Sequence, residues 1–155
     1  MAGARQGPGR RLDGRGRVSG SAQHLRRVLR LCLKAWELPF LVDAAELALT
    51  ELIANVVRHA PDRRGQTLFF RLPRGEGVRV EVADSSPAVS LAVTGDPLDD
   101  GWQGGRGLVL VNAVTDDWDI VKRWDGGGKT VWFECLTPPE SGDSRFRTAR
   151  PAPRP

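Results

Sequence analysis

Three polar residues stand four positions apart inside an apolar stretch of the sequence: Glu51, Asn55 and His59. Because residues three or four positions apart are neighbours on an α-helix, these side chains would stack along one stripe. The carboxylate, carboxamide and imidazole would lie on the flank of the buried face or farther round, where polar groups can look into a cleft. A cleft site and an ordinary amphipathic helix with solvated polar residues both fit this stretch.

A second candidate is the Gly-rich segment Gly105-Arg-Gly107, which leads into a helical pattern. At a helix N-terminus, free backbone N–H groups and the positive end of the helix dipole together favour a polyphosphate. The alternative is a plain turn, because a single G-x-G is common in turns.

Asp84 ends the strand-like run Val80-Glu-Val-Ala-Asp84 and so carries a carboxylate to the mouth of a sheet. There it can accept a hydrogen bond from an amino group such as that of adenine. The alternative is an aspartate that forms a turn with the Ser85-Ser-Pro87 segment after it.

Periodic apolar positions define the elements that must hold these residues. In order, the sequence predicts a helix from Ser19 or Ser21 to Pro39, a helix from Leu41 or Asp43 to Ala60, strands at 67–72 and 78–83, a short helix from Leu108, and strands at 118–124 and 130–136. The segment between Asp84 and Gly105 is long for a connection, which indicates a functional lid. This order predicts an α+β fold, a two-layer sandwich with helices on one face of a mostly antiparallel sheet, with room for a short edge strand before the first helix.

The 155 residues suit one domain, predicted at 19–136, between a Gly/Arg-rich tail at 1–18 and a Pro/Arg-rich tail at 137–155 that we expect to be disordered. The net charge is +4, but the basic residues crowd the two ends, so no direct nucleic-acid partner is expected. Neither a signal peptide nor an apolar run of about 18 residues is present, so no membrane association is expected.

The cysteines and histidines are few. Cys32 and Cys135 stand in apolar runs typical of core positions, which indicates a reduced, cytoplasmic setting. The only histidines are His24 and His59, so no cluster of histidine and cysteine metal ligands is expected.

Four motifs in order resemble the ATP-site boxes of the superfamily that contains gyrase, chaperone, histidine-kinase and mismatch-repair ATPases. They are Glu51-x-x-x-Asn55, Asp84-x-Ser86, Gly105-x-Gly107-Leu108 and Gly128-Lys129-Thr130. The chain is most similar to the small single-domain branch, the anti-sigma-factor serine/threonine kinases, whose members often read E-L-x-x-N-x-x-x-H-A, D-x-S, G-R-G-L-x-L-V and G-K-T-V-W-F. The resemblance spans about residues 20–136 and implies the histidine-kinase-like (Bergerat) ATPase fold.

The resemblance also implies ATP and magnesium as cofactors. Asn55 would coordinate the magnesium that bridges the ATP phosphates, which suits a carboxamide oxygen because magnesium prefers oxygen ligands. Glu51, one turn earlier, would be the catalytic general base that takes the proton of a serine hydroxyl or of water.

The remaining boxes would hold the nucleotide. Asp84 would accept a hydrogen bond from the adenine amino group, with Thr130 assisting from the neighbouring strand. The phosphates would lie at the start of the third helix, against Gly105, Arg106, Gly107 and Leu108, held mainly by backbone N–H groups. For His59 we expect a packed, hydrogen-bonded side chain, and for Lys129 a solvated position on a turn rather than a phosphate contact.

Two classes of function follow from the resemblance. The first is an ATP-binding anti-sigma factor that phosphorylates a serine or threonine of an anti-anti-sigma (STAS-type) partner and forms a homodimer. The second is a module that sequesters a sigma factor or another regulator, with ATP in a structural role or without ATP. The second is motivated by Asp84-Ser-Ser86, where the wider superfamily has D-x-G-x-G, because a side chain now stands where the backbone would approach the nucleotide. A sensor histidine kinase fragment is disfavoured, since residues 1–40 supply one helix rather than a helical hairpin.

Overall fold

The computed structural model describes residues 12–17, 22–86 and 105–139. The predicted lid at 87–104 and most of both predicted tails lie outside the described residues. The described elements are, in order, β1 (Leu12–Arg17), α1 (Ala22–Ala35), a 3₁₀ turn (Pro39–Leu41), α2 (Val42–His59), β2 (Gly65–Arg71), a second 3₁₀ turn (Pro73–Gly75), β3 (Gly77–Asp84), α3 (Gly105–Val114), β4 (Asp117–Lys122) and β5 (Lys129–Leu136).

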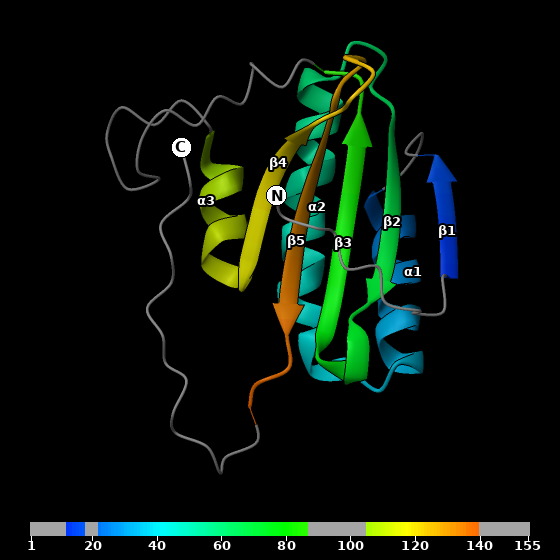
Figure 1. Ribbon diagram of the computed structural model, residues 1–155, viewed down its shortest axis with the longest axis vertical. Coiled ribbons are helices and arrows are strands. Elements are labelled where there is room, and N and C mark those ends of the chain that lie inside the picture. Colours follow the sequence, from blue (N-terminus) through cyan, green and yellow to red (C-terminus); the bar gives the residue numbers. More distant parts are fainter. Residues whose placement is uncertain (1–11, 18–21, 87–104, 140–155) are drawn as a thin grey trace.

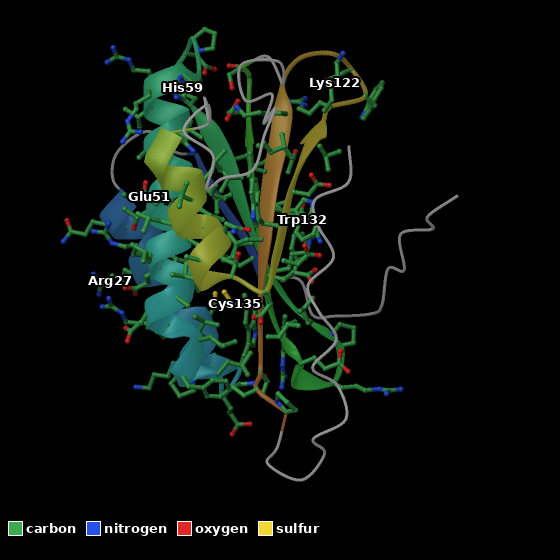
Figure 2. All side chains as sticks on the ribbon, turned by 90° about the vertical axis from the view of Figure 1, so that its left-hand side faces the viewer. Arg27, Glu51, His59, Lys122, Trp132 and Cys135 are labelled. Atoms are coloured by element: carbon green, nitrogen blue, oxygen red, sulfur yellow. The ribbon has the colours of Figure 1, made fainter. Side chains whose placement is uncertain are left out.

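The five described strands form one sheet in the order β1-β2-β3-β5-β4, and every neighbouring pair is antiparallel. Helices α1, α2 and α3 lie on one face of this sheet, as Figures 1 and 2 show from two directions. The predicted α+β two-layer sandwich is confirmed.

Strand β1 lies at the sheet edge, inside the segment whose composition predicts disorder. It pairs with β2 from Leu12, opposite Phe69, to Arg17, opposite Gln66, with an irregular register between them. Edge pairing needs only backbone groups, which satisfy the N–H and C=O groups that β2 would otherwise present to solvent. It is the short edge strand before the first helix for which the sequence leaves room.

Helix α2 is the central helix of the core. Asp43 in its first turn and Arg58 in its last turn complement the helix dipole. The helix ends at Ala60, which is extended at ψ 129°, because Pro61 disfavours a helical conformation in the residue before it. Its buried face consists of Ala45, Ala48, Leu49, Leu52, Ile53, Asn55 and Val56.

Alternate residues of the two central strands face the helices. The buried set is Val78, Val80, Val82 and Asp84 on β3 and Lys129, Val131, Phe133 and Cys135 on β5. Figure 2 shows Cys135 between the sheet and the helices, and Trp132 on the opposite side of the sheet. Because side chains alternate along a strand, the same period that buries the valines also carries Asp84 and Lys129 to the helix side.

Candidate functional site

Glu51 of α2 lies against the first turn of α3. A Cβ atom placed on Gly107 would come within 2.7 Å of Glu51 Oε2, too close for the carboxylate to stay where it is. Glycine at 107 therefore leaves room for this carboxylate. The first turn of a helix presents N–H groups without intrahelical partners and the positive end of the dipole, so a carboxylate is favoured there.

Asn55 follows Glu51 by one turn, as the sequence predicts, and its side chain is buried with 7% exposure. Its Nδ2 atom has no hydrogen-bond partner among the described residues. A buried amide without a partner pays the desolvation penalty of a polar group without the compensating bond. Such a group is typical of a site whose ligand completes it.

The turn of α2 that carries Asn55 lies at the end of the sheet where β3 finishes. Gly65 shows this, because a Cβ atom on it would be 3.3 Å from Val56 Cγ1 and 3.0 Å from the carbonyl oxygen of Ala83. Gly65 is also the register partner of Asp84. Asn55 and Asp84 therefore belong to the same end of the molecule, at which Figure 2 shows His59 and Lys122.

Asp84 forms a buried ion pair with Lys129. The two residues are register partners on β3 and β5, and Lys129 Nζ lies 2.9 Å from both Oδ1 and Oδ2 of Asp84. The lysine side chain is 1% exposed and the aspartate side chain 2%. The expectation that Lys129 is solvated on a turn is wrong, because β5 begins at Lys129 and its alternation turns this side chain toward the helices.

Ser86 completes this cluster. Its backbone N–H donates to Asp84 Oδ1 at 2.8 Å, its hydroxyl donates to the same oxygen, and Lys129 Nζ donates to the hydroxyl oxygen. Gly128 allows the strands to meet here. Its φ is +148°, and a Cβ atom on it would lie 1.9 Å from the carbonyl oxygen of Asp84.

Thr130 does not join Asp84. It lies next to Lys129 on β5 and faces the opposite side of the sheet, where its register partner is Ala83. There it lines a shallow hollow with Gln66, Leu68, Glu81, Ala83 and Arg123. Lys129, rather than Thr130, lies on the same face of the sheet as Asp84, because neighbouring residues of one strand point to opposite faces.

The other predicted residues are placed as follows. His59 is exposed at the end of α2, so the expectation that it is packed is wrong. Gly105 and Arg106 begin α3, and Leu108 is fully buried in the core. Because the Leu108 side chain is used for packing, only its backbone remains for a ligand.

Asp62, just after α2, accepts a hydrogen bond from the segment after β3. Ser85 donates its hydroxyl hydrogen to Asp62 Oδ1 at 2.9 Å, and the backbone N–H of Arg64 donates to the same atom at 3.0 Å. These bonds, that from Arg64 first, lower the pKa of the Asp62 carboxyl below its ordinary value. A side-chain hydrogen bond therefore joins the loop after α2 to the Asp84-Ser-Ser86 motif.

Both cysteines are free and buried, as the sequence predicts for core positions. Burial, with a smaller contribution from the charge of Asp116, raises the pKa of the Cys135 thiol to about 12. Burial also raises the pKa of Cys32. Neither thiol is suited to act as a nucleophile, since the thiolate is the reactive form.

The described residues offer neither a metal-binding cluster nor a membrane-spanning helix. No group of three or more His, Cys, Asp and Glu side chains in the described part could hold a metal ion. None of the described helices has both the length and the apolar character needed to cross a membrane.

Comparison with known families identifies the domain. The model of the histidine kinase-like ATPase domain matches residues 19–135, most of the chain. The chain belongs to this family. A comparison with curated proteins finds no match.

A histidine kinase-like ATPase domain implies ATP, and the residues present fit one half of that ligand. The unpaired amide of Asn55 suits a magnesium ligand after a half-turn of the amide, which exchanges its nitrogen and oxygen. The bare backbone of Gly107 beside Glu51 suits phosphates at a helix start. Where adenine would bind, Asp84 is paired with Lys129 and its side chain is only 2% exposed, so this carboxylate is not open to an adenine amino group.

Proposed function

We propose that the chain is an ATP-binding anti-sigma factor that transfers the γ-phosphoryl group of ATP to a serine or threonine of an anti-anti-sigma (STAS-type) partner. The observation that carries the proposal is the placement of Glu51 beside Gly107, one helical turn from the unpaired amide of Asn55. It supports the proposal because a carboxylate, a carboxamide and the start of a helix are the groups that a general base, a magnesium ligand and a phosphate site require.

The roles follow from the chemistry of each group. Glu51 takes the proton of the attacking hydroxyl, and its contact with Gly107 at the start of α3 orients the carboxylate for that task. Asn55 supplies a neutral oxygen ligand that orients magnesium without adding negative charge near the phosphates. Gly107 leaves the backbone of α3 open to the phosphates. Bound ATP supplies the phosphoryl group, and catalysis rests on positioning and electrostatics.

The test is phosphotransfer with radiolabelled ATP and magnesium to a set of candidate STAS-type proteins. Glu51→Gln keeps the shape of the side chain but removes the base, and we expect it to abolish labelling of the partner. Glu46→Gln is the matched control, since Glu46 lies on the same helix, where it pairs with Arg30 of α1 at 2.8 Å. Labelling that is absent with the native chain, or unchanged in Glu51→Gln, contradicts the kinase proposal.

A second candidate function is favoured by the ion pair between Asp84 and Lys129. Because Lys129 already pairs with the carboxylate expected to bind adenine, the domain would act as a sequestering module. It would bind a sigma factor or another regulator without ATP. Its signature would be a stable complex with the regulator whose affinity is the same with ATP, with ADP and with neither. A complex that forms only with nucleotide contradicts this second function.

A further inference from the structure

Lys129 donates to both oxygens of Asp84, the carboxylate that the resemblance assigns to the adenine amino group. We propose that Lys129 is the specificity-determining residue of the nucleotide site. Its ammonium group replaces the adenine amino group as the partner of Asp84, so that the native chain does not recognise adenine through this carboxylate. A nucleotide bound to the native chain is then held through its phosphates and magnesium, with little distinction between bases. This inference rests on the nucleotide cleft of the proposed function, but not on phosphotransfer.

Four hydrogen bonds already end on the Asp84 carboxylate, three on Oδ1 and one on Oδ2. An ammonium group has three N–H donors, and those of Lys129 are directed to Oδ1 and Oδ2 of Asp84 and to the hydroxyl of Ser86. Oδ1 of Asp84 also accepts both the backbone N–H and the hydroxyl of Ser86. Oδ2 keeps one acceptor position, but the Asp84 side chain is 2% exposed, so an adenine amino group reaches it only if a neighbouring group moves aside.

The competition between the two donors favours the lysine. Lys129 offers a charged donor, and charge-assisted hydrogen bonds are about twice as strong as neutral ones. It is also part of the same chain and is held opposite Asp84 by the strand register, so its binding costs no translational freedom. The adenine amino group is neutral and arrives from solution. Lys129 therefore stays in place when a nucleotide binds.

The position of Lys129 is also fixed by its surroundings. The side chain is 1% exposed, so leaving Asp84 would strand a carboxylate in a buried site. Gly128 holds the start of β5 against the end of β3, with its backbone next to the carbonyl of Asp84. A lysine so confined differs from Lys122, its register partner on β4, which is exposed.

The experiment compares ATP with N⁶,N⁶-dimethyl-ATP, which has no amino N–H to donate, and with GTP, each titrated calorimetrically in the presence of magnesium. The proteins are the full native chain, Lys129→Thr, the double variant Asp84→Asn/Lys129→Thr, and Lys122→Thr as the matched control. The double variant avoids a buried unpaired charge while keeping an acceptor at position 84. Circular dichroism establishes that each variant is folded.

We expect Lys129→Thr to bind ATP roughly ten- to hundredfold more tightly than the native chain, the range of one hydrogen bond to a charged group. The gain should be lost with dimethyl-ATP. The double variant should show the same preference for ATP over dimethyl-ATP, more weakly, and it decides the outcome if Lys129→Thr does not fold. The native chain and Lys122→Thr should not distinguish ATP, dimethyl-ATP and GTP.

Different results separate this inference from the proposed function. A native chain that binds ATP much more tightly than dimethyl-ATP overturns the inference and leaves the kinase proposal standing. Binding of ATP by Lys129→Thr but not by the native chain supports the inference and contradicts the kinase proposal. Absence of ATP binding from the native chain and from every folded Lys129 variant overturns both.

Discussion

Gly107 of α3 and Glu51 of α2 are in such close contact that a single methyl group on the glycine would reach within 2.7 Å of Glu51 Oε2. The atom in the way is the end of a flexible side chain, so it can move, whereas the backbones can stay in place. The contact therefore constrains the position of the carboxylate more than the stability of the fold.

For this reason we expect Gly107→Ala to retain its fold but to displace Glu51. Its free energy of unfolding should change by less than about 1 kcal/mol, since alanine is also the better helix former. The rate of phosphotransfer should fall at least roughly a hundredfold, because that is the smallest typical contribution of a positioned general base. In a Glu51→Ala background the added Gly107→Ala should cost only what the methyl group takes from phosphate binding, and a loss as large as in the native background would contradict displacement of Glu51 as the cause.

Asn55 offers a test in which stability and ligand binding should respond in opposite directions. Because its Nδ2 atom lacks a partner, Asn55→Leu should leave the free energy of unfolding unchanged or increase it. Magnesium-dependent nucleotide binding should be lost. Thr67→Val is the control, because Thr67 Oγ1 is also buried without a partner among the described residues, and its loss should not affect the ligand. Denaturant unfolding and calorimetry measure the two effects.

The Asp84–Lys129 pair predicts strong coupling in stability. Lys129→Met should lower the free energy of unfolding by about 3–5 kcal/mol, because it leaves a buried carboxylate without its counter-charge. Asp84→Asn/Lys129→Met should recover most of that loss, since neither charge remains. Lys122→Met, at an exposed position opposite Lys129, should change stability by no more than about 0.5 kcal/mol. Equal effects of the two lysine variants in urea unfolding would rule out the coupling.

Gly128 and Gly126 form a pair of turn glycines with different surroundings. Gly128→Ala should destabilise the fold by roughly 3 kcal/mol or more, since the new methyl group would meet the Asp84 carbonyl, a backbone atom, at 1.9 Å. Gly126 has a φ of +70° but nothing within 4 Å of a built Cβ, so Gly126→Ala should cost about 1 kcal/mol, the penalty of its backbone conformation alone. Thermal unfolding of the two variants should rank them in this order.

The buried thiol of Cys135 predicts a loss of stability at alkaline pH. Its pKa in the folded chain is about 12, above the ordinary 9.0, so the folded state keeps the proton longer than the unfolded state. The stabilisation from this group is complete below pH 9 and is lost as the pH rises from about 9 toward 12. Cys135→Ala should flatten that part of the profile in unfolding experiments. In the native chain at neutral pH, alkylation of both cysteines should require denaturant.

The sequence determined the layout of the fold. The apolar period of 42–59 predicts α2, the alternation in 78–84 predicts β3, and their order along the chain predicts a two-layer sandwich. These features are local, because a helix or strand that buries one face must repeat its apolar residues with its own period. The placement of the motif residues is also local: Glu51 and Asn55 are one turn apart in a single helix, and Asp84 ends a single strand.

The tertiary structure decided what these residues touch. The alternation along β5, Lys129, Val131, Phe133, carried enough information to place the lysine on the buried face, but it could not show that Asp84 is the group opposite. That pairing depends on the register between β3 and β5, which brings together Asp84 and Lys129 although they are 45 residues apart along the chain. The register places Lys129, rather than Thr130, opposite Asp84. Neighbouring residues of a strand face opposite sides of the sheet, so a shift of one residue would have turned the lysine away from the aspartate.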